Sequence, residues 1–244
     1  QQVTRDPTDL AGMKAEWFVP KAPQGGSVLF VHGGSFIYGS LATHAEMMAR
    51  VAVAGSRRVI GFEYRLAPEH PFPAALEDVL AAYRELRARG HQDIVLAGDS
   101  AGGNLAAAAT LALREAGESP RAAVLLSPWV DLAARGGTLV SNAPFDYAEP
   151  EDFVKWAGCY LGDASPDDPR ASPLRADLSK LPPLFVVVGT AWLEVLLRAR
   201  VYRRWRRLFL TLLPVVAVFV VWDVYAIASG HWTFDPEQTT GVIL

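Results

Sequence analysis

Short continuous apolar runs alternate with longer amphipathic segments along most of the chain. The apolar runs lie at about 28–31, 59–63, 93–97, 122–126 and 184–188. Continuous apolar runs are typical of parallel strands that are covered on both faces. Helical spacing of apolar residues occurs near 44–54, 74–89, 103–115 and 151–160. This alternation predicts an α/β fold, with a mostly parallel sheet and helices on both faces. Proline-rich stretches at 144–150 and 166–173 predict loops at the rim of the sheet.

The pattern changes near residue 192, where basic residues and then a long apolar stretch follow. The basic residues of this segment are Arg198, Arg200, Arg203, Arg204, Arg206 and Arg207. Residues 208–228 are almost entirely apolar, interrupted chiefly by Thr211, Pro214 and Asp223. About 20 such residues are enough to cross a bilayer, and arginines at one end would stay in the cytoplasm. We expect an apolar helical tail that either associates with a membrane through 208–228 or packs inside a core.

Composition narrows the class of protein. The chain has 244 residues and a net charge of −3, with 23 basic and 26 acidic residues. Mild acidity argues against a nucleic-acid partner. The single cysteine, Cys159, permits no internal disulfide, and we expect it to be packed rather than reactive. Neither metal-ligand spacing nor a phosphate-binding glycine loop occurs, so no metal and no cofactor are expected.

Two short motifs carry the candidate chemistry. Gly98-Asp99-Ser100-Ala101-Gly102 follows an apolar run and precedes a helical pattern. Strand, sharp turn and helix are the context of a nucleophile elbow, which would expose Ser100 at the end of a sheet. The second motif, residues 32–36 (His-Gly-Gly-Ser-Phe), follows another apolar run and can bring backbone N–H groups close to a substrate. For the motif around Ser100, the alternative is a chance match or a purely structural use. For residues 32–36, the alternative is an ordinary glycine-rich turn after a strand.

With these motifs, the chain resembles the hormone-sensitive-lipase-like esterases among the α/β-hydrolases. The resemblance covers about residues 11–191. It also rests on further motifs in the order of that family: Gly39-Ser40, Thr43-His44, residues 64–75 (YRLAPEHPFPAA), Ser127-Pro128-Trp129 and Ser172-Pro173-Leu174. It implies hydrolysis of carboxylic esters with small or medium acyl chains and without a cofactor.

The resemblance also implies roles for single residues. Ser100 is the expected nucleophile, and the N–H groups of Gly33, Gly34 and Ala101 are the expected oxyanion hole. Asp99 receives no catalytic role from the motif. Residues 64–69 are expected to shape the floor of the site, and His70 is expected to be structural.

An acid and then a histidine must follow the serine in this fold. The resemblance points to Glu194 as the acid, although Arg198 stands where the family usually has a second acidic residue. The alternative for Glu194 is a surface carboxylate on a helix. His231 is the one histidine after Glu194, and its surroundings do not match the family's catalytic loop. We therefore expect activity that is impaired by loss of the catalytic histidine region.

Residues 192–244 have a resemblance of their own, to the membrane-embedded lycopene cyclase domain of carotenoid pathways. It rests on Trp222-Asp223 and on residues 230–236 (Gly-His-Trp-Thr-Phe-Asp-Pro). The expected domains are therefore a truncated α/β-hydrolase core at 1–191, without N-terminal cap helices, and a tail of different origin at 192–244. The alternative function is a catalytically dead hydrolase fused to this fragment. The N-terminus shows no secretory signal, which favours a cytoplasmic location.

Overall fold

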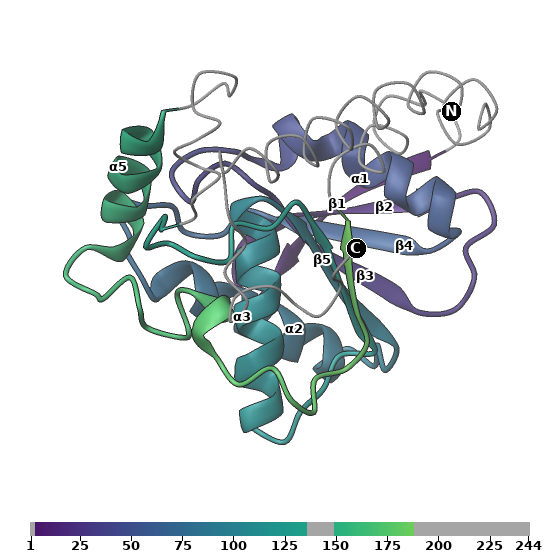
Figure 1. The fold of residues 1–244 in the computed structure, drawn as a ribbon. Helices are drawn as coiled ribbons and strands as arrows, with labels where there is room; N and C mark the ends of the chain where they lie inside the picture. The colour runs from purple at the N-terminus through teal and green to yellow at the C-terminus, as the bar shows by residue number, and fades with distance from the viewer. Residues whose placement is uncertain (1–2, 136–148, 188–244) are drawn as a thin grey trace, which may run out of the picture. The chain divides into compact units, whose positions relative to one another are not determined.

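A computed structural model describes residues 3–135 and 149–187, all of which belong to one compact unit of the chain, residues 1–196 (Figure 1). These residues form a seven-stranded sheet in the order β1-β2-β4-β3-β5-β6-β7. The tail expected at 192–244, its apolar stretch 208–228 and most of the proline-rich stretch 144–150 lie outside the described residues. Within the described residues, the structure has no helix whose length and apolar character would suffice to span a membrane.

The parallel part of the sheet agrees with the apolar runs. Its strands are β3 (Ser27–Val31), β4 (Arg58–Phe62), β5 (Ile94–Asp99), β6 (Ala122–Leu126) and β7 (Leu184–Val187). These five strands are neighbours in the sheet order β4-β3-β5-β6-β7, and each neighbouring pair is parallel. Every residue of β3 is buried, as expected for a strand covered on both faces.

An antiparallel hairpin at the start of the chain was not predicted. It consists of β1 (Val3–Leu10) and β2 (Met13–Pro20), and β2 also pairs antiparallel with β4. The turn between the strands holds Ala11 and Gly12 at positive φ, as tight hairpins require. Most of β1 is exposed and polar, and Pro7 lies in it, which an edge strand tolerates. Such a strand leaves no apolar run in the sequence.

The expected helices form, with ends shifted by up to three residues. They are α1 (Leu41–Gly55), α2 (Ala74–Ala88), α3 (Ala101–Glu115) and α5 (Pro150–Leu161), and a short 3-10 helix, η2, spans Pro173–Arg175. A capping box between Ser40 and Thr43 begins α1. Cys159, expected to be packed, is instead exposed on α5.

Alternate residues of β3 enter two different cores, so helices cover both faces of the sheet (Figure 1). Val28 and Phe30 pack in a cluster with Met47 and Met48 of α1. The intervening residues of β3 pack on the opposite side with α2 and α3. Because β3 and β5 are parallel neighbours inside the sheet, their carboxyl ends, where the two candidate motifs begin, lie side by side.

Candidate active site

Ser100 stands at a strained turn between the end of β5 and the start of α3. Its backbone has φ 52° and ψ −118°, a conformation that L-residues rarely adopt. The neighbouring glycines make the turn sterically feasible. A Cβ on Gly98 would collide with the carbonyl oxygen of Gly102, and a Cβ on Gly102 would collide with that of Val31. The predicted nucleophile elbow is thus present in its backbone geometry.

Backbone hydrogen bonds fix the elbow from two sides. The Ser100 N–H donates to the carbonyl oxygen of Leu126 at 2.9 Å, which ties the turn to the end of β6. The Ser100 carbonyl oxygen accepts from the N–H groups of Asn104 (3.0 Å) and Trp129 (3.1 Å). Ser100 is half-buried, and its hydroxyl has no hydrogen-bond partner among the described residues. A hydrogen-bonded backbone therefore holds a hydroxyl that is unengaged by the described residues.

The glycine loop after β3 lies against this elbow. Asp99, the residue before Ser100, accepts a hydrogen bond from the Gly33 N–H at 2.9 Å. This contact differs from the expectation, because it engages one of the three predicted oxyanion donors. Within the described ranges, the N–H groups of Gly34 and Ala101 donate to no acceptor, and neither does that of Ser35. Ser35, which lies at positive φ beside Gly34, was not among the predicted donors.

The first turn of α3 adds to the positive character of this region. Ser100 is the N-cap of α3 and makes no side-chain capping bond, so the first N–H groups of the helix remain available. Aligned peptide dipoles place a partial positive charge at this end of the helix. The site is therefore suited to stabilise a negative oxygen next to Ser100 Oγ.

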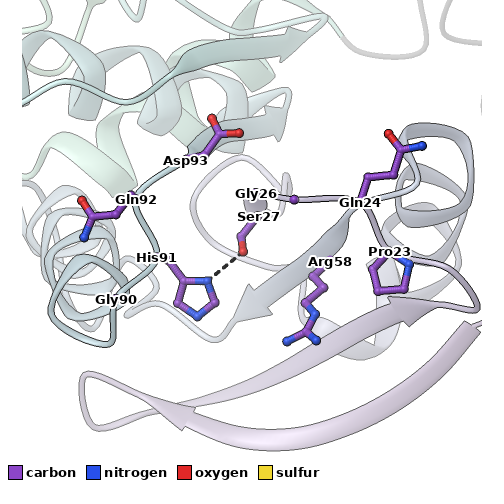
Figure 2. Close-up of a pocket in the computed structure, with 10 residues that line it drawn as sticks. Pro23, Gln24, Gly26, Ser27, Arg58, Gly90, His91, Gln92 and Asp93 are labelled. Carbon is purple, nitrogen blue, oxygen red and sulfur yellow. Dashed lines mark hydrogen bonds between the residues drawn. The ribbon is translucent and has the colours of Figure 1, made fainter.

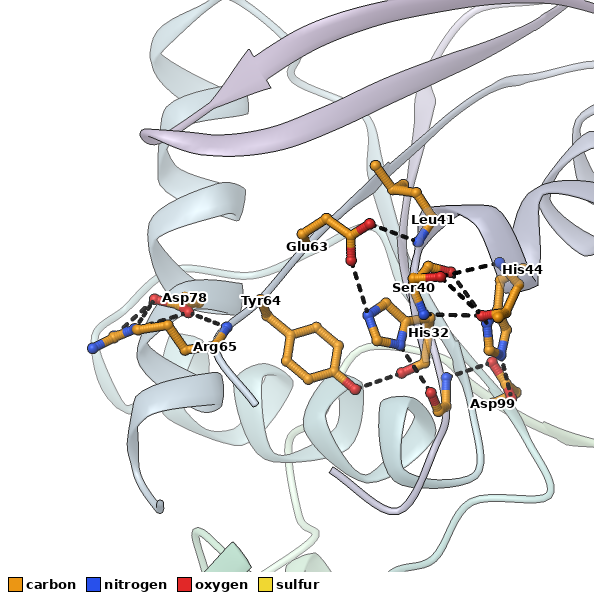
Figure 3. A network of polar contacts seen from close by, with 11 residues as sticks. His32, Ser40, Leu41, His44, Glu63, Tyr64, Arg65, Asp78 and Asp99 are labelled. Atoms are coloured by element: carbon orange, nitrogen blue, oxygen red, sulfur yellow. Dashed lines mark hydrogen bonds and ion pairs between the residues drawn. The ribbon is translucent and has the colours of Figure 1, made fainter. Parts of the chain in front are cut away.

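Behind the loop lies a group of buried and partly buried titratable side chains (Figure 3). His44 of α1 approaches the Asp99 carboxylate, with 3.4 Å between Nε2 and Oδ2. His32 contacts the Gly33 carbonyl oxygen through Nδ1 at 2.8 Å, and its Nε2 lies 3.9 Å from Glu63. The two histidine rings are 5.4 Å apart between centroids. These contacts connect α1, β4 and β5 to the loop.

The two histidines have opposite protonation behaviour. Burial lowers the pKa of His32 and outweighs its bond to the Gly33 carbonyl oxygen. For His44, burial acts in the same downward direction, but the hydrogen bond and attraction to Asp99 outweigh it and raise the pKa. His44, which faces Asp99, is therefore the more readily protonated of the two histidines.

The segment 64–69 packs against the glycine loop, and its expected role as the floor of the site stays a prediction. Tyr64 stacks on His32, with ring centroids 4.3 Å apart, and donates its hydroxyl to the His32 carbonyl oxygen at 2.8 Å. The Ala67 N–H donates to the carbonyl oxygen of Phe36 at 2.9 Å. His70 is exposed on the surface.

The two Ser-Pro motifs hold loops against α3. Asn104 donates through Nδ2 to the carbonyl oxygens of Trp129 (2.7 Å) and Ala171 (2.8 Å). Ser172 Oγ accepts from the Leu132 N–H at 2.9 Å and donates to the Pro166 carbonyl oxygen at 2.6 Å. These contacts hold the loops around Trp129 and Ala171 against α3, next to the elbow.

Glu194, the predicted acid, and His231, the one histidine that follows it, both come after residue 187 and lie outside the described part of the chain. The described histidines are His32, His44, His70 and His91, and none of them forms a hydrogen bond with Ser100. The structure therefore brings Ser100 close to the predicted N–H donors, and none of these four histidines is in hydrogen-bond contact with Ser100.

A pocket of about 470 Å³ lies elsewhere, around the start of β3 and the loop that precedes β5 (Figure 2). It includes another serine–histidine contact, 2.9 Å between Ser27 Oγ and His91 Nδ1. Ser27 is only 2% exposed, and His91 stacks on Trp17. This contact joins β3 to the loop before β5 and gives an ester no access to the hydroxyl.

Comparison with known proteins agrees with this geometry. A family model described as "alpha/beta hydrolase fold" matches residues 28–206. The chain belongs to the α/β-hydrolase fold family. It is similar to a structure of an esterase from the bacterial hormone-sensitive lipase family, with 44% identity, a TM-score of 0.75, and coverage of 81% of this chain and 68% of that one.

Curated relatives point in the same direction. An acetyl-hydrolase of Streptomyces hygroscopicus is 42% identical over 180 residues, which are 72% of this chain and 60% of the relative. An esterase of Acinetobacter venetianus is 39% identical over 197 residues, 78% of this chain and 64% of the relative. The chain thus spans less than two thirds of the length of these relatives.

The family match also bears on the expected boundary in the chain. It continues to residue 206, beyond the boundary expected at 191 and into the arginine-rich segment. Glu194 lies inside the matched range, whereas the apolar stretch 208–228 and His231 lie outside it. The division at 191 and the origin of the tail stay predictions.

Proposed function

We propose that this chain is a carboxylic ester hydrolase that acts through an acyl-enzyme on Ser100. The observation that carries the proposal is the strained backbone of Ser100 at the start of α3, beside N–H groups that have no described acceptor. The family match and the similarity to proteins named acetyl-hydrolase and esterase support it.

The reaction begins when Ser100 Oγ attacks the ester carbonyl carbon, and a base takes the hydroxyl proton. The carbonyl oxygen becomes negative and accepts hydrogen bonds from Gly34 and Ala101, with the N–H of Ser35 beside them. Collapse of the tetrahedral intermediate expels the alcohol, which takes a proton from the protonated base. Water then attacks the acyl-enzyme by the same route and releases the carboxylic acid.

The donor set differs in one respect from the set expected from the motif. Gly33 donates to Asp99, so the proposed donors are Gly34 and Ala101. Loss of one oxyanion donor raises the barrier by roughly 3–4 kcal/mol in serine hydrolases. Glu194 is proposed as the acid that orients the base. His231 is the one histidine after Glu194, and so it is the first residue to vary in a search for the base.

The proposed substrates are esters with small acyl groups. The acetyl-hydrolase name of the Streptomyces relative supports this class. The steps above use protein groups and water, and the proposal includes neither a cofactor nor a metal.

Hydrolysis of p-nitrophenyl acetate tests the proposal. We expect turnover by the wild-type chain and none above background by Ser100→Ala. Equal rates for these two proteins would contradict it. A single burst of p-nitrophenol without turnover would show that Ser100 acylates but that deacylation lacks its base. Comparison with Glu194→Gln and His231→Ala then shows whether these residues contribute.

For the remainder of the chain, we propose from sequence alone that residues 192–244 form a tail resembling the lycopene cyclase domain. Its apolar stretch, 208–228, would associate with a membrane and keep the hydrolase part in the cytoplasm. The length of the stretch and the arginines before it support this. Recovery of the full chain in a membrane fraction, and of a chain ending at residue 207 in the supernatant, is the expected result.

A further inference from the structure

Asp99 lies between the nucleophile and the loop that carries the oxyanion donors. It is the last residue of β5, is 8% exposed, and directly precedes Ser100. One carboxylate oxygen accepts the Gly33 N–H at 2.9 Å, and the other lies 3.4 Å from Nε2 of His44. A Cβ on Gly33 would collide with this carboxylate, so loop and carboxylate are in close contact.

This hydrogen bond connects two parts of the site that come from distant parts of the sequence, beyond the point where the pairing of β3 and β5 ends at Val31 and Gly98. Asp99 is bonded covalently to Ser100, and Gly33 is bonded covalently to the donor Gly34. A hydrogen bond from a backbone N–H to a carboxylate is stronger and shorter than one between neutral groups. The position of the Gly34 donor relative to Ser100 therefore depends on Asp99.

His44 stabilises the carboxylate in this position. Its other ring nitrogen contacts Thr43 Oγ1 at 2.8 Å, which fixes the ring at the start of α1. The charged and titratable groups that face His44 are Asp99 from β5, Glu63 beside β4 and His32 after β3. A protonated His44 balances the negative charge of Asp99, which would otherwise oppose a developing oxyanion nearby.

We propose that Asp99 is a positioning residue of the oxyanion hole, in which its carboxylate holds Gly33, and thereby Gly34, while His44 holds the carboxylate. This inference rests on the proposed function and adds a residue to which the motif gave no role. Asparagine at position 99 can still accept the Gly33 N–H, whereas alanine cannot. The two substitutions therefore separate the hydrogen bond from the charge.

The first test measures labelling of Ser100 by a fluorophosphonate probe under pseudo-first-order conditions. Since a small misplacement in a site can cost about 100-fold in rate, we expect Asp99→Ala to label roughly 10- to 100-fold more slowly than wild type. Asp99→Asn should restore most of the rate. Asp93→Ala, at the opposite end of β5, is the matched control and should label at the wild-type rate. Equal labelling of Asp99→Ala and wild type would overturn the proposal.

The second test does not depend on activity. In ¹H–¹⁵N spectra, the Gly33 amide proton of the wild type should be shifted downfield by the carboxylate and should follow the titration of His44. In Asp99→Asn, the His44 titration midpoint should fall. The proposal would be overturned if the chemical shift of the Gly33 amide changed neither with the titration of His44 nor in Asp99→Asn. If the Gly33 amide responds as expected but the wild type is not labelled, the Asp99 contact stands and the proposed esterase function fails.

Discussion

Tyr64 lies nearly parallel to the ring of His32, with centroids 4.3 Å apart, and donates its hydroxyl to the carbonyl oxygen of the same residue at 2.8 Å. Both residues are almost fully buried. Because His32 directly precedes Gly33, this pair fixes the start of the loop that carries the proposed oxyanion donors. The aromatic contact and the hydrogen bond can be separated by mutation.

Tyr64→Phe should keep the stacking and remove the hydroxyl donor. The His32 carbonyl oxygen then loses a partner in a buried place, so the free energy of unfolding should fall by about 1–3 kcal/mol. Urea denaturation measures this change. Tyr38→Phe is the control, because Tyr38 is 52% exposed and its hydroxyl makes only a 3.3 Å contact with Ser35. The control should change the free energy by less than about 0.5 kcal/mol, and equal losses in both variants would contradict the assigned role of Tyr64.

Gly102→Ala should disrupt the elbow. The added Cβ would run into the carbonyl oxygens of Val31 and His32, which belong to the backbone and cannot move aside freely. We expect a loss of roughly 1–3 kcal/mol in the free energy of unfolding. Gly158→Ala in α5 is the matched control, since nothing lies within 4 Å of its added Cβ. Alanine is the better helix former, so the control should gain about 0.5–1 kcal/mol. A neutral Gly102→Ala would mean that the elbow is not packed as described.

The histidines behind the loop should titrate on opposite sides of their ordinary pKa, which is 6.5. Contact with Asp99 raises the pKa of His44, whereas burial lowers that of His32. Ring resonances followed by NMR should show a midpoint above 6.5 for His44 and below it for His32. A His44 midpoint at or below that value would contradict its contact with Asp99.

The raised pKa of His44 also predicts a pH dependence of stability. Because its pKa in the folded state exceeds that of the unfolded state, its contribution is fully present below the unfolded value. The contribution is lost as the pH rises through the folded pKa. The difference in unfolding free energy between wild type and His44→Gln should therefore be largest in mildly acidic solution and should shrink towards alkaline pH. His91→Gln, at the opposite end of the sheet, should not show this decline, because the pKa of His91 is lowered chiefly by burial.

Much of the fold could be predicted from the sequence because a buried parallel sheet produces continuous apolar runs. The strands β3 to β7 followed from that physical rule, and the helices between them followed from the helical spacing of their apolar residues. The hairpin β1–β2 could not be found in this way, since β1 is a polar edge strand. Exposure of Cys159 was also missed, because a lone cysteine carries no signal of its position on a helix.

The candidate site could likewise be predicted only in part. The position of Ser100 followed from a local pattern, because the glycines around it are required within a few residues of chain. The engagement of Gly33 by Asp99 could not be predicted, because these residues lie 66 positions apart and meet only in the folded sheet. Neither the motif nor its spacing indicates which N–H group of a glycine loop is already occupied.

Covalent labelling followed by peptide mass spectrometry tests the central claim most directly. The folded wild-type chain should take up one fluorophosphonate adduct, located on the peptide that contains Ser100, and Ser100→Ala should take up none. An unlabelled wild-type chain, or an adduct that persists in Ser100→Ala, would contradict the assignment of Ser100 as the nucleophile.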